Sequence, residues 1–525
     1  MKQDRHKRLY DLHSWAGILL GLFIYVVCFS GTVALFGDEL GPWENPSLRL
    51  AVPERTAAIN EQFKEFVAAT SSKGTLTFAR LDFPHDIAPY YMAFAGYSDD
   101  SGETTFIEEK WHPETAKLLP ERGDGLSHWI LDIHRKLMLP TTLGRTLVGI
   151  AGVVMMVLII TGILIHGKII KDFFTLRLQR SDRLKWQDSH KVLGIFGLPF
   201  YIMISFTGAF LGVVTILSPV VALIAFQGDT EALIAKVLGE PPQASGEIVQ
   251  MYSMDQVHTL KFPGTDMKPV RVIVDNYGDK NAVYRVIYPS ETELSSFDQV
   301  TISGADGTAV DTELDITRVT AANRVVNALT PLHYATYGGI WLKWIYAALG
   351  LFMTILTATG LMLFVERRLH GSEGKKSDAF YERLSRINIG VCMGFPLATA
   401  ALFYLDKLYT GVEAERMYWT GVTYFTVAIG TTVFSLFQQD GYRNVKQLMA
   451  TLGMLVLCIP VINAIYTGAQ FWTANSVGDV LSNGVDISTI VLGLLIVFSS
   501  TQIPACRNDE RPRLSDKTIG AVPAE

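Results

Sequence analysis

Two stretches of this chain repeat each other: His13-Ser-Trp-Ala-Gly17 opens an apolar run that closes at Ser30-Gly31, and His190-Lys-Val-Leu-Gly194 opens another that closes at Thr207-Gly208. In each run the histidine and the closing glycine are 18 residues apart (31 − 13 and 208 − 190). On an α-helix this is about five turns, so both ends of each run lie on one helix face, roughly 27 Å apart.

A second pair of histidines follows the same logic. His134 precedes an apolar run that contains Gly152 and Thr161-Gly162, and His333 precedes one that contains Gly350 and Thr359-Gly360. Four histidines at the mouths of four apolar helices, in two duplicated pairs, indicate bis-histidine metal or haem ligation inside a membrane bundle.

The composition supports a membrane protein. The chain has 525 residues, 49% of them hydrophobic and 18% charged, which is too apolar and too long for one ordinary soluble domain. The sequence has no stripe of basic residues of the kind that binds nucleic acid, so we expect no nucleic-acid partner. Three of the four cysteines (Cys28, Cys392, Cys458 and Cys506) sit in apolar runs, so we expect no disulfide framework. The sequence has no CxxCH motif, so haem would be bound without a covalent link.

Hydropathy predicts a polytopic α-helical membrane protein. Eight apolar segments approach or exceed the length that a bilayer core of about 30 Å requires: 14–37, 143–166, 191–225, 340–365, 387–406, 416–437, 447–468 and 485–503. The first follows a basic N-terminus without a convincing cleavage site, so we interpret it as an uncleaved helix. The third is long and contains Pro199, which predicts a kink or a helix that runs out past the lipid.

Basic residues predict the orientation. Lysine and arginine are concentrated before the first span, between the second and third spans and between the fourth and fifth, in the segments 2–8, 168–185 and 367–386. The loop 407–415 has Lys407 as its only basic residue, and the loop 469–484 has no lysine or arginine. The positive-inside rule therefore places both termini in the cytoplasm. Contact with anionic lipid is the simplest role of the basic loops, and docking of a cytoplasmic electron donor is the alternative.

This topology leaves two large extracytoplasmic segments, and each is predicted to be a small α+β domain. Helical spacing runs over 54–70 and 253–260, and strands are expected at 75–81, 89–95, 104–107, 270–274 and 282–287. Trp111–Leu118 and Ile302–Val310 each look like a strand, a tight turn and a strand. The predicted boundaries are 1–37 for the N-terminus and span one, 38–142 for the first domain, 143–225 for spans two and three, 226–339 for the second domain, 340–386 for span four and its loop, 387–503 for an appended four-span module, and 504–525 for the tail.

The topology also sorts the histidines by depth. His13 and His190 lie at the cytoplasmic face, and His134 and His333 lie at the outer face, as two stacked bis-histidine haems would require. Glycine leaves room for the flat macrocycle, so the candidate packing residues are Gly17, Gly194, Gly31 and Gly208, the last two near the outer pair. The alternative is that each histidine is an interfacial residue and that the glycines serve helix packing.

Other candidates are weaker. His166, at the cytoplasmic end of span two, is a reserve ligand or a haem-propionate partner, because the matching position in span four is Phe364. Asp132, Arg135 and Tyr334 flank the outer pair and could orient it or contact propionates. Tight zinc spacings, phosphate loops and dinucleotide fingerprints are absent from the sequence.

These motifs, taken in order, resemble the PepSY-associated transmembrane family. The resemblance rests on the two His-x-x-x-Gly runs that close in Ser/Thr-Gly, on His134-Arg-Lys-Leu before Gly144, and on His333-Tyr-Ala-Thr-Tyr-Gly-Gly339, and it covers about residues 5–368. It implies a four-span core with two periplasmic PepSY-like domains in the inner membrane of a bacterium. It also implies two b-type haems whose axial ligands, carried over by position, are His13, His134, His190 and His333.

The family includes siderophore reductases, so the resemblance implies electron transfer from an unidentified donor on the cytoplasmic side to a periplasmic acceptor, with a ferric siderophore as the expected one. Two alternatives stay open. The periplasmic domains could be a membrane-anchored binding or regulatory module without redox activity, or spans five to eight could form a path for an iron chelate. Against transport, those spans hold few intramembrane charges, and Asp406, Glu413 and Glu415 cluster near one outer end, whereas a permeation path usually places polar groups deeper.

Overall fold

The computed structural model of the chain describes residues 2–99, 104–120, 122, 125–166, 182–230, 232–233, 242–289, 297–310, 321–369, 375–468, 472–473 and 475–504. Part of the evidence for orientation lies outside these residues: most of the basic loop between spans two and three (167–181), the loop 370–374 and the C-terminal tail from 505, including Cys506.

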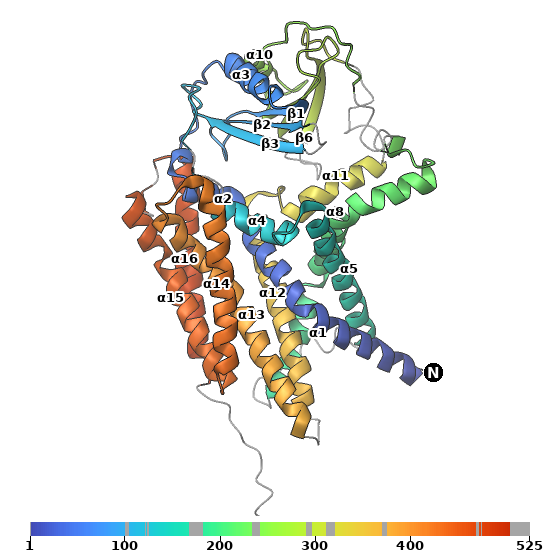
Figure 1. The fold of residues 1–525 in the computed structure, drawn as a ribbon, viewed down its shortest axis with the longest axis vertical. Coiled ribbons are helices and arrows are strands. Elements are labelled where there is room, and N and C mark those ends of the chain that lie inside the picture. The colour runs from blue at the N-terminus through green and yellow to red at the C-terminus, as the bar shows by residue number, and fades with distance from the viewer. Residues whose placement is uncertain are drawn as a thin grey trace, which may run out of the picture.

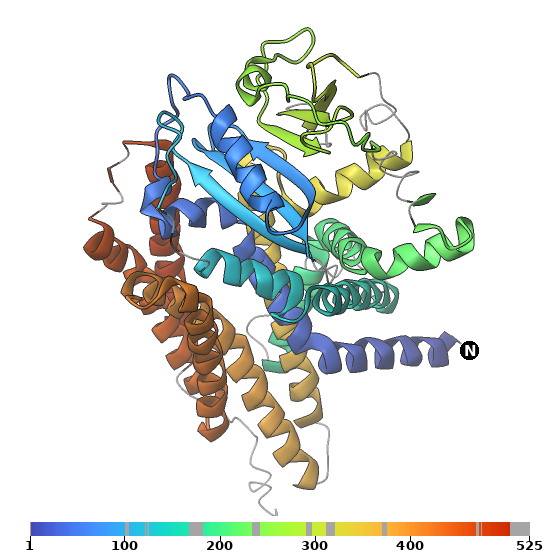
Figure 2. The same ribbon diagram turned by 45° about the horizontal axis from the view of Figure 1, so that its top comes forward.

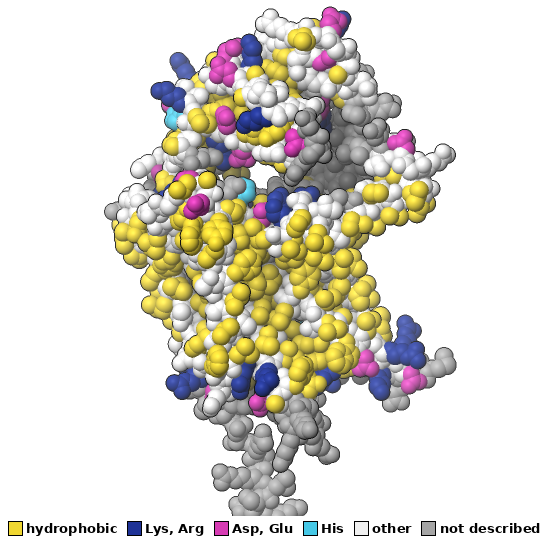
Figure 3. Space-filling view, in the orientation of Figure 1, with side chains coloured by type: hydrophobic (Ala, Val, Ile, Leu, Met, Phe, Trp, Pro, Cys, Tyr) yellow, Lys and Arg dark blue, Asp and Glu magenta, His cyan; other side chains and the backbone are white. Residues whose placement is uncertain are grey.

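Long apolar helices dominate the described chain. Seven are long and apolar enough to cross a membrane: α1 (Lys2–Ala34), α5 (Thr141–Ile165), α12 (Gly339–Leu369), α13 (Lys375–Leu408), α14 (Arg416–Phe437), α15 (Gly441–Thr467) and α16 (Val477–Thr501). The helices α7 (Asp182–Phe196) and α8 (Leu198–Ala225), bent by 71° at their junction, pass the same test only together and make an eighth span if they cross as one unit. Hydrophobic side chains cover the sides of the bundle, and charged ones gather at its two ends (Figure 3). The chain is therefore a multi-pass membrane protein, and its described part has seven apolar helices of spanning length, or eight spans if the bent pair is one, where the sequence predicted eight.

The predicted kink lies two residues before the proline that suggested it. The chain breaks at Gly197, and Pro199 occupies the first turn of α8, where a missing backbone N–H costs nothing. The ring of Tyr201, a buried residue, fills the space beside Gly197, where a Cβ would collide with it. Glycine at position 197 therefore leaves room for the ring of Tyr201 beside the bend.

Four spans form a closed core. Helix α1 packs against α5 and α12, α5 packs against α8, and α7 packs against α12. Two short helices that the sequence analysis did not predict, α4 (Leu126–Lys136) and α11 (Ala321–Tyr334), lie between this core and the β-sheet (Figure 1). Helices α13–α16 stand beside the core (Figures 1 and 2), and α2 (Gly37–Glu44), followed by a 3-10 turn at Pro46–Leu48, joins α1 to the face of α16.

The two extramembrane segments share one antiparallel sheet. Its strands are β1 (Thr75–Asp82), β2 (Tyr91–Ser98), β3 (Thr104–Trp111), β4 (Arg271–Asp275), β5 (Val283–Pro289) and β6 (Phe297–Ser303), in the order β3-β2-β1-β4-β5-β6. Strands β1 and β4 join the halves, with Ala79 opposite Val274 and Asp82 opposite Arg271. The sequence predicted one α+β unit in each segment, and the structure joins the strands of both units edge to edge.

Local patterns within the sheet follow the sequence closely. The two expected strand-turn-strand units end in the isolated bridges Trp111↔Leu118 and Ile302↔Ala309. Each half adds one helix, α3 (Asn60–Ser71) or α10 (Met254–Thr259), and both helices cover the same face of the sheet (Figures 1 and 2). Because side chains alternate between the faces of a strand, that face carries the apolar core, which includes Phe63, Leu81, Val272, Val274 and Tyr284.

Candidate functional site

Two pairs of histidine rings face each other inside the core. We call His13 and His190 the far-side pair, because they lie away from the sheet, and His134 and His333 the sheet-side pair. The ring centres are 6.3 Å apart in the far-side pair and 6.1 Å apart in the sheet-side pair. The planes cross at 81° and 16°, respectively. The topology thus brings together the same partners that depth in the membrane predicted.

The ring of His13 contacts the neighbouring span α5. Its Nδ1 lies 3.0 Å from the carbonyl oxygen of Leu158 and 3.1 Å from Thr161 Oγ1. Gly162, the next residue, lies beside the ring, and a Cβ there would be in ordinary contact with it, 3.5 Å from His13 Cε1. The Thr161-Gly162 pair of α5 therefore forms the surface against which the imidazole from α1 packs, and we call such a Ser/Thr-Gly pair a seat.

His190 sits on α12 in the same way. Its Nδ1 lies 3.1 Å from the carbonyl oxygen of Leu356 and 3.2 Å from Thr359 Oγ1. A Cβ at Gly360 would lie 3.1 Å from His190 Cε1. The two far-side histidines thus have matching surroundings in the two halves of the chain.

The sheet-side pair uses the other two Ser/Thr-Gly pairs. His134 of α4 places Nδ1 3.0 Å from the carbonyl oxygen of Val27, and a Cβ at Gly31 would lie only 2.6 Å from its Cε1. His333 of α11 places Nδ1 2.9 Å from Thr207 Oγ1, and a Cβ at Gly208 would lie 3.0 Å from its Cε1. Gly31 and Gly208 therefore lie beside the sheet-side pair, as their five-turn spacing from His13 and His190 predicts.

The hydrogen bonds select one tautomer of the imidazoles. A carbonyl oxygen can only accept, so the Nδ1 of His13, His134 and His190 donates its proton. The hydroxyl of Thr207 already donates to Met203 O of its own helix (2.9 Å), so it accepts from His333 Nδ1. In all four rings Nε2 is then left with a free lone pair, as a metal ligand requires.

Both sheet-side histidines are neutral at physiological pH. Burial lowers the pKa of His134, an effect that the hydrogen bond to Val27 partly offsets. Burial, together with the neighbouring His134, lowers the pKa of His333 to about 3. A neutral imidazole is the form that binds metals.

The spacing of the rings fits a metal ion between them. An imidazole nitrogen lies about 2 Å from its metal, and the ring centre lies about 1.2 Å further out, so two ligands on opposite sides of one ion put their ring centres roughly 6.4 Å apart. The observed distances of 6.3 and 6.1 Å agree with this value. Each ring can rotate about its own metal bond, so both interplanar angles are compatible with it. In the described part of the chain, histidine, cysteine and acidic residues form no cluster of three or more.

The remaining predicted residues are placed less tightly. A Cβ at Gly17 would meet no atom within 4 Å, and one at Gly194 would meet only Leu356 Cδ1, at 3.7 Å. Space is thus present beside both residues, but no protein group uses it closely. His166 follows the last residue of α5.

The residues predicted to flank the outer pair divide in two. Tyr334 stands edge-to-face against His333, with ring centres 5.6 Å apart. Asp132 is held on its own helix by Arg135 and Lys136, each 2.9 Å away. The structure therefore brings Tyr334 to the pair, whereas Asp132 and Arg135 bind each other.

Sequence reasoning gave no role to the seats of the far-side histidines. Thr161-Gly162 and Thr359-Gly360 were visible as repeats, but only the folded bundle shows that each receives a ring from a neighbouring helix. The sequence signal that could have identified these sites is the Ser/Thr-Gly pair, which recurs four times, once in each core span.

Comparison with known proteins agrees with this architecture. The family model described as "PepSY-associated TM region" matches residues 10–367, well over half of the chain. The protein therefore belongs to the PepSY-associated transmembrane family, a class of polytopic membrane proteins. The match ends at Arg367 within α12, so helices α13–α16 lie outside it. Among curated proteins, "Uncharacterized protein PA4219" of Pseudomonas aeruginosa is 25% identical over 400 residues, which cover 74% of this chain and 97% of that protein.

Proposed function

We propose that this chain is an electron-transfer protein of a bacterial inner membrane that holds two non-covalent b-type haems. One haem would lie between His13 and His190 and the other between His134 and His333. The observation that carries the proposal is the pair of ring-centre distances, 6.3 and 6.1 Å, together with Nδ1 hydrogen bonds that leave the Nε2 of every ring unprotonated.

Charge supports an orientation with the sheet in the periplasm. Arg367 and Arg368 end α12 at the far end of the bundle, and Figure 3 shows basic side chains along that end. The positive-inside rule assigns such an end, with both termini, to the cytoplasm. The two sheet halves are then periplasmic insertions in a duplicated four-span core, and the sheet-side pair lies nearest the periplasm.

Within this proposal the chain's own residues hold and orient the cofactor. The core helices keep the rings out of water, the carbonyl and threonine acceptors hold the proton on Nδ1 and leave Nε2 unprotonated, and the glycines let the rings approach the spans. Bound haem would supply a one-electron carrier at each of two depths.

The periplasmic acceptor that we propose is a ferric siderophore. Hard oxygen ligands hold Fe(III) much more tightly than Fe(II), so a single electron delivered to the chelate would loosen the metal. The electron would come from an unidentified donor on the cytoplasmic side. Membrane lipid surrounds the helices, and we assign no nucleic-acid partner.

Purified protein tests the cofactor first. A pyridine haemochrome assay should find two haems per chain, both extractable by acidic acetone because no covalent link holds them. Protein that carries no haem, or haem that resists extraction, would contradict the proposal. The membrane-anchored binding module would then be the better description.

Sealed vesicles test the direction and the acceptor. Dithionite-reduced protein should be reoxidised by a membrane-impermeant ferric trihydroxamate only when the chelate has access to the sheet side, and His134→Ala should abolish this reoxidation. Reoxidation from the other side alone would reverse the orientation, and none from either side would exclude this chelate class as the acceptor.

A further inference from the structure

The appended helices α13–α16 hold the helix that carries His134. A buried ionic network lies where these helices meet the end of α2. The side chain of Arg416, at the start of α14, pairs with Asp406 of α13 and lies 3.6 Å from Glu44 of α2. These three side chains are only 1–2% exposed. Lys407 completes the network, 3.0 Å from Asp406 Oδ2.

Glu44 links this ionic network to the N-terminus of α4. Its carboxylate accepts hydrogen bonds from the backbone N–H groups of Leu126 (2.8 Å) and Ser127 (3.2 Å), and from the Ser127 hydroxyl (2.7 Å). Helix α4 has Gly125 at its N-cap and no side-chain cap of its own. A Cβ at Gly125 would collide with Glu44 Oε1 and lie 3.1 Å from Arg416 Nε. The first N–H groups of α4 are therefore satisfied by a residue that α14 holds in place.

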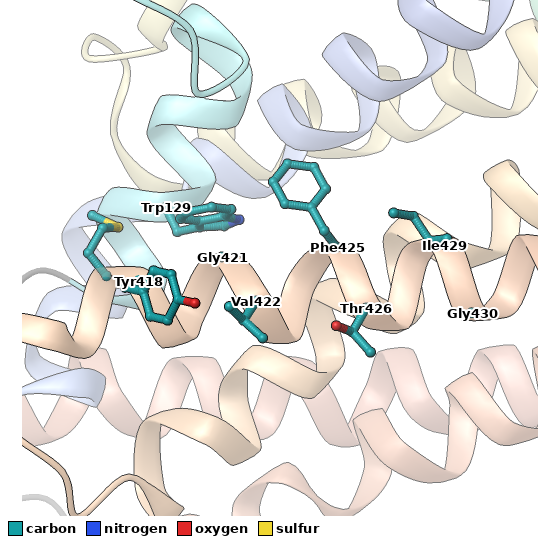
Figure 4. Close-up of a pocket in the computed structure, with 9 residues that line it drawn as sticks. Trp129, Tyr418, Gly421, Val422, Phe425, Thr426, Ile429 and Gly430 are labelled. Atoms are coloured by element: carbon teal, nitrogen blue, oxygen red, sulfur yellow. The ribbon is translucent and has the colours of Figure 1, made fainter.

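The middle of α4 rests on α14 directly. Trp129, 4% exposed, packs edge-to-face against Tyr424 and Phe425, with ring centres 5.8 and 5.9 Å apart. Its ring lies over Gly421, where a Cβ would be 2.7 Å from Trp129 Cη2 (Figure 4). Five residues further along the same helix, about 7.5 Å by the α-helical rise, His134 reaches toward α1.

We propose that the appended module positions His134, and with it the sheet-side haem, through two contacts with α4: the Arg416–Glu44 link to its N-terminus and the Trp129–Gly421 contact in its middle. Glu44, Arg416 and Trp129 are positioning residues, since they act through α4 and not on the iron. The inference rests on the proposed function for its haem readouts but not for its structural one. It assigns a role to helices that lie outside the family match.

A matched pair of alanine variants on α14 tests the second contact. Gly421→Ala places a methyl group against Trp129, whereas a Cβ at Gly430 would meet no atom within 4 Å, so Gly430→Ala is the control for adding alanine to the same helix. In full-length protein, Gly421→Ala should change the low-spin EPR signal and the midpoint potential of the sheet-side haem and leave those of the far-side haem unchanged. Gly430→Ala should change neither haem.

A second pair tests the ionic contact. Arg416→Gln should shift the same sheet-side signals, and Arg416→Lys, which keeps the charge, should restore them in part. Arg386→Gln is the control, because Arg386 donates to Leu436 O at the other end of the module. If Arg416→Gln does not fold, the Gly421→Ala and Gly430→Ala pair decides the question.

Hydrogen exchange of residues 126–136 provides a readout that needs no haem. Exchange should quicken by roughly tenfold in Arg416→Gln, since Glu44, whose carboxylate caps α4, loses the cation that holds it, and by less in Gly421→Ala. Unchanged exchange and unchanged sheet-side spectra in both variants would overturn the inference. Faster exchange in protein that lacks haem would support the positioning of α4 while refuting the proposed function.

Discussion

The two histidine pairs are built on different kinds of helix. His13 and His190 belong to helices that are themselves parts of spans, whereas His134 and His333 belong to α4 and α11, which lie between the bundle and the sheet. The packing of the core spans therefore sets the far-side pair directly. The sheet-side pair depends on two extra helices and on whatever holds them, so it is the pair that surrounding elements can adjust.

The two pairs also differ in the hydrogen-bond acceptors around their rings. Each far-side Nδ1 has a carbonyl and a threonine acceptor. For the sheet-side rings we find a carbonyl at His134 and a threonine at His333. The far-side environment is thus symmetric and redundant, and the sheet-side environment is neither.

Removal of a ligand should have the largest effect. If the proposed haems are bound, His13→Ala and His190→Ala should each remove the far-side haem, and His134→Ala and His333→Ala should each remove the sheet-side haem, because each haem would lose one of the two histidines that hold it. Haem content should fall from two to one per chain, with the remaining spectrum intact. If His13→Ala and His134→Ala removed the same haem, the division into these two pairs would be broken.

A methyl group at the glycine seats should have the next largest effect. Gly31→Ala would put a Cβ 2.6 Å from His134 Cε1, whereas Gly162→Ala would put one at an ordinary 3.5 Å from His13 Cε1. We expect Gly31→Ala to displace the ring and lower sheet-side haem occupancy, at an overpacking cost of about 1–3 kcal/mol. Gly162→Ala should keep both haems. Haem titration of the two variants measures the difference in occupancy. Equal occupancies would show that the glycine beside His134 is no more critical than the glycine beside His13.

Loss of one threonine hydroxyl should have the smallest effect. Thr207→Val removes the acceptor found for His333 Nδ1, whereas Thr359→Val leaves His190 the carbonyl of Leu356. One hydrogen bond of about 1 kcal/mol corresponds to a potential shift on the order of 40 mV for a one-electron couple. Redox titration should show a shift of that size for the sheet-side haem in Thr207→Val and a smaller far-side shift in Thr359→Val. The reverse order would show that redundancy of acceptors does not protect the far-side pair.

Repeats and hydropathy predicted much of the fold and of the site. The apolar spans, the strand-turn-strand units and the candidate residues of the bundle all follow from periodicity, because burial in lipid or against a sheet demands a regular apolar pattern. Helices α4 and α11 escaped prediction because they are short and amphipathic, and they run into the apolar segments that follow. The broken span was expected at Pro199, yet the break falls at Gly197, where a Cβ would collide with the ring of Tyr201.

The sequence by itself determined which segments leave water, where histidine recurs and where glycine follows serine or threonine, since these depend on local composition and spacing. Only the tertiary structure decided which rings face each other, that four Ser/Thr-Gly pairs are their seats, that both strand sets share one sheet, and that Arg416 reaches α4 through Glu44. Those contacts join residues more than a hundred positions apart, such as His13 with Thr161 and Glu44 with Arg416. They arise from the packing of whole helices, which no local pattern encodes.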